Sequence, residues 1–253
     1  MFNFEDTRYN RQEQMPEWGK ERQEKLKEAK VAVIGAGGVK STFLMALVAG
    51  GIGNIRIIEF DTIELSNLNR QVLYRTDDIG RTKGQAALTT LTRLNPDINI
   101  ELIEEKISEN NIDNLLKDWD FIVEGGESPA GRNLVNEYCL QHKKPFTHAS
   151  AQFSYGYAFS VVPKEKSACF ACFFPEDHTR PEHTGAVPVN VLSTSLAGSI
   201  GAAEVFKWFL GYQDRMLTNK RLCFSSLLLS GEFTVEQQSR REDCPVCSIH
   251  YNN

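Results

Sequence analysis

The sequence lacks a long hydrophobic run. No stretch approaches the roughly 18 consecutive apolar residues of a membrane-spanning helix, and the first residues are polar and charged rather than signal-like. We therefore expect a cytoplasmic chain with no membrane partner. A basic patch is also missing, because the net charge is −5 and the densest charged segment, residues 20–30, mixes both signs. A nucleic-acid partner would normally require a basic face, so none is expected.

Cysteine is scarce, with six in 253 residues. In a cytosolic chain such residues are more often free thiols or metal ligands than disulfides. Four of them form two CxxC pairs, Cys169 with Cys172 and Cys244 with Cys247. Two such pairs can complete a closed tetrahedral site for structural Zn²⁺. The long gap between the pairs leaves a redox motif or unrelated thiols as alternatives.

Short apolar strands alternate with helices over the first 150 residues or so, which predicts a doubly wound α/β sheet. The predicted strands are 30–34, 54–60, 98–103, 120–123 and 145–150, and the predicted helices include 41–49, 83–94 and 129–142. Later segments predict an antiparallel strand at 155–162, a long apolar helix at 192–210 and a hairpin at 221–235. The predicted fold class is α/β, a Rossmann-like mixed sheet with a parallel N-terminal half and an antiparallel C-terminal part.

A glycine-rich loop follows the first predicted strand and opens a helix. Gly35, Gly37 and Gly38 let the backbone approach phosphates closely, and the helix N-terminus offers free N–H groups. Glu59 and Asp61 stand at the end of the second strand, where an acid can hold ribose hydroxyls. The alternative for the glycines alone is a turn that only packs strand on helix. The strand, loop, helix and acid in this order favour a nucleotide site.

Three cations belong to the same predicted site. Lys40 takes the place of the usual third glycine, where it can contact phosphate or partly fill the phosphate site. Arg70 and Lys83 follow the ribose acid. Such cations stabilise a reacting polyphosphate and a departing pyrophosphate, which nicotinamide chemistry does not release. Taken singly, each is explained as a surface charge, but together with the loop they favour nucleotidyl transfer over an NAD-dependent oxidoreductase.

These motifs resemble the adenylating family that includes ThiF, MoeB, HesA and the ubiquitin-activating enzymes. The resemblance rests on the glycine loop, Ser66-Asn67-Leu68-Asn69-Arg70-Gln71, the N-terminal Arg8-Tyr9-Asn10-Arg11-Gln12 and the cysteine pairs. It implies a single adenylating domain over residues 1–253. Residues 1–29 would form an N-terminal arm and helix, 30–150 a nucleotide-binding half, and 151–253 an antiparallel sheet with a crossover loop and a zinc-tied C-terminus.

The resemblance also implies roles for individual residues. The implied ATP-binding residues are Gly35, Gly37, Gly38, Lys40, Glu59, Asp61, Asn67, Arg70, Gln71 and Lys83. Arg70 and Lys83 would be catalytic through the triphosphate, Glu127 would bind Mg²⁺, and Arg11 would reach the ATP of a second subunit in a homodimer. Zn²⁺ would be held by Cys169, Cys172, Cys244 and Cys247. Glu127 replaces the family's aspartate, which shifts the metal by about one methylene.

The implied reaction is ATP-dependent adenylation of a carboxylate or carboxamide on a peptide or small protein. No cysteine occurs between Cys172 and Cys223, so we expect no thioester or acyl-disulfide step in the crossover loop at 177–184. Residues 67–78, 188–190 and 219–221 look closer to the branch that modifies ribosomal peptides, as in microcin or pantocin maturation. The alternatives are the C-terminus of a ubiquitin-like sulfur carrier, as in the thiamine and molybdopterin pathways, and a nucleotide-binding scaffold with impaired catalysis, which Lys40 and Glu127 motivate.

Overall fold

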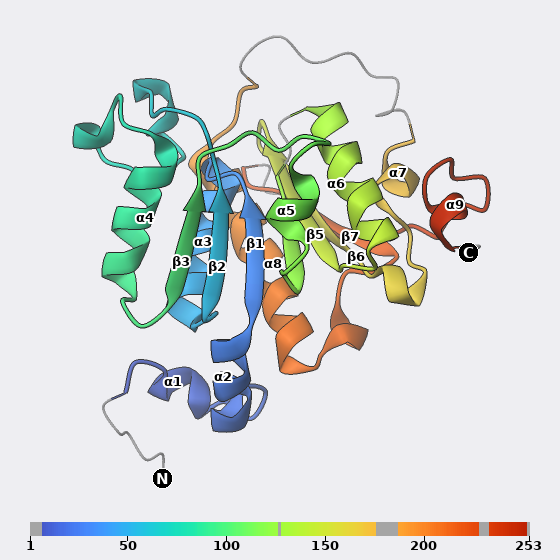
Figure 1. Cartoon of the computed structure of the whole chain (residues 1–253), viewed down its shortest axis with the longest axis horizontal. Coiled ribbons are helices and arrows are strands. Elements are labelled where there is room, and N and C mark those ends of the chain that lie inside the picture. Colours follow the sequence, from blue (N-terminus) through green and yellow to red (C-terminus); the bar gives the residue numbers. More distant parts are fainter. Residues whose placement is uncertain (1–6, 126–127, 176–186, 228–232, 252–253) are drawn as a thin grey trace.

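One eight-stranded sheet forms the centre of the protein (Figure 1). The computed structural model describes residues 7–125, 128–175, 187–227 and 233–251. The strand order is β3-β2-β1-β4-β5-β6-β7-β8, parallel from β3 to β5 and antiparallel from β5 to β8. The strands are β1 (Lys30–Ile34), β2 (Asn54–Ile58), β3 (Asn99–Ile103), β4 (Phe121–Glu124), β5 (Phe146–Gln152), β6 (Tyr155–Val161), β7 (Lys220–Ser225) and β8 (Thr234–Gln237). The predicted mixed sheet is therefore confirmed.

Helices cover both faces of this sheet (Figure 1). On one face lie α3 (Gly38–Gly50) and α8 (Val191–Leu210), and on the other α5 (Ile112–Leu116) and α6 (Pro129–Gln141), while α4 (Lys83–Leu94) flanks β3. The remaining helices are α1 (Asn10–Glu13), α2 (Gly19–Glu28), α7 (Phe170–Phe173) and α9 (Cys247–Tyr251). None of the helices described here is both long enough and apolar enough to cross a bilayer.

Strand β1 is buried on both faces, which explains its continuous apolar sequence. Val31 and Val33 pack in the core beneath α3, whereas Ala32 and Ile34 pack in the core beneath α6. The helix α8 lies so close to α3 that a Cβ atom on Gly198 would stand 2.4 Å from the carbonyl oxygen of Val39. This close approach brings the start of α8 against the start of α3, beside the glycine loop.

The predicted long elements agree with the observed ones to within a few residues. The short helices α1, α5, α7 and α9 were not predicted, because one turn of helix carries too little hydrophobic periodicity to be recognised. The hairpin predicted at 221–235 is present as the antiparallel pair β7 and β8. Part of this predicted hairpin, residues 228–232, and the crossover loop at 177–184 lie outside the described residues.

Candidate active site

The glycine loop lies at the carboxyl edge of the parallel strands, where β1 is flanked by β2 on one side and β4 on the other. This reversal of strand order is where ligands bind in open α/β sheets. Gly35 has φ +88°, a conformation that favours glycine, and its N–H donates to the carbonyl of Ile58 over 2.8 Å. The first turn of α3 follows directly, so its N-terminal N–H groups lie at this edge.

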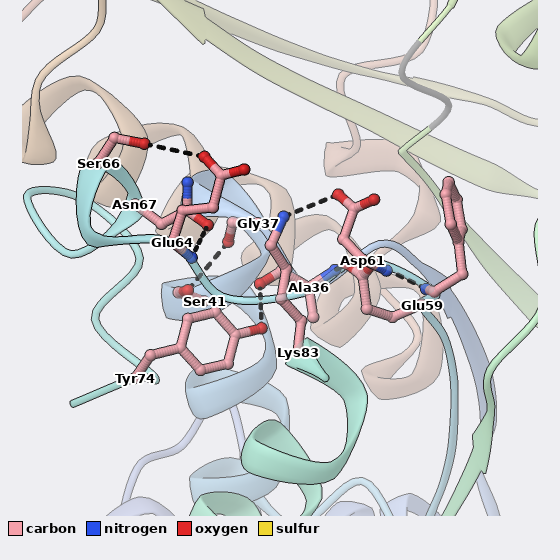
Figure 2. Close-up of polar contacts among 11 residues, drawn as sticks. Ala36, Gly37, Ser41, Glu59, Asp61, Glu64, Ser66, Asn67, Tyr74 and Lys83 are labelled. Carbon is pink, nitrogen blue, oxygen red and sulfur yellow. Dashed lines mark hydrogen bonds and ion pairs between the residues drawn. The ribbon is translucent and has the colours of Figure 1, made fainter. Parts of the chain in front are cut away.

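Glu59 and Tyr74 both bond to the peptide groups of Ala36 in this loop (Figure 2). The buried carboxylate of Glu59 accepts the N–H of Ala36 at 2.7 Å and those of Phe60 and Asp61 at 2.8 Å each. The hydroxyl of Tyr74 donates to the carbonyl of Ala36 over 2.8 Å. Glu59, the predicted ribose acid, thus lies directly after β2, and backbone N–H groups occupy most of the acceptor positions of its carboxylate.

Lys83 pairs with Asp61 at the same edge. The ammonium of Lys83, the first residue of α4, lies 2.8 Å from a carboxylate oxygen of Asp61, and the backbone N–H of Lys83 donates to the carbonyl of Asp61 at 2.8 Å (Figure 2). The lysine side chain is 9% exposed and that of Asp61 is 31% exposed. Asp61 therefore holds a mostly buried cation beside the loop.

The segment with Asn67, Arg70 and Gln71 folds over the start of α3. A Cβ atom on Gly38 would lie 3.3 Å from Cγ of Arg70 and 3.0 Å from Cγ2 of Thr194, so glycine allows this approach. The guanidinium of Arg70 donates to the carbonyl of Ser66 at 2.9 Å, and the amide oxygen of Asn67 accepts the N–H of Glu64.

Gln71 is buried beside Gly37, and its amide oxygen has no hydrogen-bond partner among residues 7–125, 128–175, 187–227 and 233–251. Buried polar atoms are nearly always bonded, so this oxygen is available to a ligand of the loop.

Lys40 points beneath the loop rather than along its surface. It is 5% exposed, and its side chain lies so near Gly125 that a Cβ atom there would stand 2.9 Å from Cε of Lys40. Burial lowers the pKa of Lys40 to about 8, and the charge of Glu124 partly offsets this shift. Nδ1 of His148 contacts the carboxylate of Glu124, and both side chains are buried. Lys40 thus joins a buried polar group formed by α3, β4 and β5.

The position of Lys40 makes stability depend on pH. Its pKa falls from its usual 10.5 to about 8 in the folded chain, so the unfolded chain binds more protons between these values. The free energy of unfolding of the wild type, relative to Lys40→Met, is expected to rise by up to about 3 kcal/mol from pH 8 to 10.5. Urea unfolding of both chains across this range measures the difference. A difference that stays constant with pH would mean that the ammonium is solvated.

Two predicted site residues are not placed at the loop. Arg11 lies on α1 at the amino edge of the parallel strands, opposite the glycine loop (Figure 1), and its neighbour Gln12 donates to the carbonyl of Gly50 over 2.9 Å. Arg11 therefore does not reach the loop of its own chain. Glu127, the predicted magnesium ligand, lies outside the described residues.

The two CxxC pairs form one buried cluster. Neighbouring Sγ atoms lie 3.9 Å apart for Cys169 and Cys172, 3.7 Å for Cys169 and Cys244, and 3.6 Å for Cys172 and Cys247. All four lie within 4.8 Å of one another. Four sulfurs at about 2.3 Å from a tetrahedral zinc would lie about 3.8 Å apart, so the cluster fits Zn²⁺. With four thiolates and no open position, its role would be structural.

Sequence reasoning missed several side chains around the loop, namely Tyr74, Glu124, His148 and Thr194. Glu124 carried a signal, because it is an acid directly at the end of a buried apolar strand. Tyr74, His148 and Thr194 carried no such signal in the sequence. Only the tertiary fold brings the segment after Gln71, β5 and α8 to this edge.

Comparison with known proteins places these features in a family. The family model described as "ThiF family" matches residues 9–246. The chain is 36% identical to a sulfur carrier protein adenylyltransferase of Thermus thermophilus, over 95% of this chain and 90% of that protein. Its structure is similar to that of E. coli MccB with MccA-N7isoASN, with a TM-score of 0.82 and 27% identity over 97% of this chain and 75% of that one. MccB solved with ATP gives a TM-score of 0.80 with the same identity and coverage.

Proposed function

The chain belongs to the ThiF family and is an adenylyltransferase, and from this premise we propose that it uses ATP to activate a carboxylate or carboxamide on a peptide or small protein. The observation that carries the proposal is that the side-chain stem of Arg70, the amide of Gln71 and the Lys83–Asp61 pair (Figure 2) all lie beside the glycine loop. A dinucleotide-dependent oxidoreductase has no need for cations gathered at that edge.

In the proposed reaction, an oxygen of the substrate carboxylate attacks the α-phosphorus of ATP, and the bond from that phosphorus to the bridging oxygen of pyrophosphate breaks. The products are an acyl-adenylate and pyrophosphate. No base is needed for this step, because the carboxylate is ionised at neutral pH. The N–H groups at the start of α3 bind phosphate oxygens, and Arg70 and Lys83 offset the charge that develops on the leaving group.

Two substrate classes have support. The structural likeness to E. coli MccB, which is solved with MccA, supports a short peptide substrate. The 36% identity to a sulfur carrier adenylyltransferase supports the C-terminus of a ubiquitin-like carrier. The same loop would activate either substrate.

Magnesium and a second subunit belong to the same proposal. Mg²⁺ would accompany the triphosphate, with Glu127 as its ligand. Arg11 lies at the opposite edge of its own sheet, so it would act only in the site of a second copy, as an arginine finger in a homodimer. Helix α1 would then contribute to catalysis through Arg11 without touching the nucleotide of its own chain.

Exchange of labelled pyrophosphate into ATP tests this function. We expect exchange that depends on Mg²⁺ and on one of two added substrates, a ribosomal-type peptide or a sulfur carrier with a free C-terminus. The substrate that supports exchange identifies the class. Calorimetry with ATP, AMP and NAD accompanies this assay. ATP binding without any exchange would favour the nucleotide-binding scaffold, and NAD binding in place of ATP would contradict adenylation.

A further inference from the structure

The side chain of Lys40 passes between two glycines at the carboxyl edge of the parallel strands. A Cβ atom on Gly35 would lie 3.9 Å from Cγ of Lys40, and one on Gly125 would lie 2.9 Å from Cε. Gly35 directly follows β1, and Gly125 directly follows β4. The lysine stem therefore runs beneath the glycine loop, and its ammonium lies near the end of β4.

This lysine is a buried cation at the positive end of a helix. Lys40 is the third residue of α3 and is 5% exposed. The N-terminus of a helix carries a partial positive charge, so a cation there is destabilising and an anion is stabilising. Burial is unfavourable as well, because the protein interior solvates a charge poorly. An anion at the start of α3 would offset both effects.

The residues around the ammonium offset its charge only in part. The charge of Glu124 on β4 acts on Lys40, but the same carboxylate contacts Nδ1 of His148 on β5. The ring of Phe43 lies 5.7 Å from Nζ of Lys40. Buried charges are normally paired. No hydrogen bond or ion pair joins this ammonium to another residue in the described ranges 7–125, 128–175, 187–227 and 233–251.

The other groups packed around this position bring no further counter-charge to Lys40. Arg132 on α6 is a second cation. The pKa of His148 lies below its ordinary value because of burial and because of the charges of Lys40 and Arg132, so the imidazole is neutral near pH 7. Glu59, after β2, accepts the backbone N–H of the loop at Ala36. The first turn of α8, residues 191–195, contains no charged side chain.

From this arrangement we infer that Lys40 is an internal counter-charge for the phosphates of the nucleotide, and that ATP binding in alkaline solution therefore adds a proton to Lys40. The lysine acts through its charge from beneath the loop, without a place among the groups that line its surface. This inference rests on the proposed function and deepens it, because it makes nucleotide affinity depend on pH.

Proton linkage makes the inference measurable. Burial lowers the pKa of Lys40 to about 8 in the free chain. Phosphates near the ammonium favour its charged form, so they raise this pKa towards its usual 10.5. At pH 8.5 about a quarter of the free chains carry the proton, so ATP binding should take up about 0.7 proton. A terminal phosphate group loses its last proton near pH 6, so the nucleotide itself takes up almost none.

The experiment is calorimetry of ATP binding with Mg²⁺ at pH 8.5, in two buffers that differ in their enthalpy of ionisation. The difference between the two heats gives the number of protons taken up. The wild type is compared with Lys40→Met, which keeps an unbranched side chain and removes the charge. We expect about 0.7 proton per ATP for the wild type and almost none for Lys40→Met.

The affinities should follow the same linkage. Wild-type affinity for ATP is expected to fall about tenfold from pH 7 to pH 9, because the free chain loses the proton over this range. Lys40→Met should bind ATP about 100-fold more weakly than the wild type at pH 7, the effect of a pKa shift of about two units. Its affinity should change little with pH.

Glu124→Gln provides an independent variant that keeps the lysine. Loss of this carboxylate removes the charge that partly offsets burial, so the pKa of Lys40 falls further. Proton uptake at pH 7.5 should then exceed that of the wild type, a change that a purely structural role of Glu124 would not produce. The matched control is Lys25→Met, because Lys25 forms an exposed pair with Glu21 on α2. It should match the wild type in affinity and in proton uptake.

Thermal unfolding confirms that each variant is folded. Equal proton uptake by the wild type and Lys40→Met would overturn the inference. Wild-type affinity in Lys40→Met at pH 7 would overturn it as well, and so would an unchanged proton uptake in Glu124→Gln. A wild type that binds no ATP at any pH would contradict the proposed function itself, so the two failures are distinguishable.

Discussion

Lys83→Ala is expected to lower pyrophosphate exchange by about 100- to 1,000-fold, the usual effect of removing one group that stabilises transition-state charge. Lys83 is the first residue of α4, and its ammonium is held 2.8 Å from Asp61 beside the glycine loop. The cation is therefore in place before the nucleotide arrives, and its field is weakly screened because the side chain is 9% exposed.

The fold should survive this substitution. Asp61 loses its partner, but its side chain is 31% exposed and can be solvated. Lys25→Ala is the matched control, because Lys25 forms an exposed pair with Glu21 on α2, at the edge of the sheet opposite the loop (Figure 1). It should exchange at the wild-type rate. Near-normal exchange in Lys83→Ala, with circular dichroism unchanged, would remove Lys83 from the triphosphate site.

The sequence predicted the order and type of the long elements because their signals are local. Strand β1 is a continuous apolar run ended by glycines, and α4 is ended by Asn95-Pro96. The spacing of loop, acid and cations also predicted which segments would meet at one edge of the sheet. Parallel strands direct their carboxyl ends to the same edge, so the neighbourhood of these segments follows from strand order.

The direction of individual side chains did not follow from the sequence. The sequence left open whether Lys40 contacts phosphate or fills part of the phosphate site. In the structure its side chain is buried under the loop, near Glu124. Glu59 was expected to hold ribose hydroxyls, and the structure shows that its carboxylate also accepts three backbone N–H groups. In both cases one partner, Glu124 for Lys40 and Ala36 for Glu59, lies on a segment far away in the sequence, and a contact between such segments has no periodicity that a sequence pattern can reveal.

The position of Arg11 shows a second limit. Its motif resembles that of an enzyme site, but α1 lies at the edge of the sheet opposite the loop (Figure 1). A motif records that a residue belongs to a site and says nothing about which copy of the chain supplies it. Mixing an Arg11→Ala chain with a Lys83→Ala chain provides the test, because a homodimer with shared sites would regain part of the exchange in the mixed dimers.

Cys244→Ser is expected to release the metal and to lower the melting temperature by roughly 10 °C or more. Structural zinc contributes about 10 kcal/mol or more of binding free energy in small zinc domains, and this energy stabilises the folded state. Loss of even a third of this energy corresponds to a shift of about 10 °C in a chain of this size. Cys244 is buried, and its Sγ lies 3.7 Å from that of Cys169, so the substitution removes one of the four ligands of the cluster.

Cys223→Ser separates this effect from the general effect of replacing a thiol. Cys223 is half-buried in β7 and lies outside the cluster of four. This control should retain one zinc per chain by metal analysis and melt near the wild-type temperature. A wild type that contains no zinc when purified without chelator would contradict the metal assignment. The four thiols would then tie the C-terminus to α7 through packing alone, and the two variants would differ only by the burial of the replaced side chain.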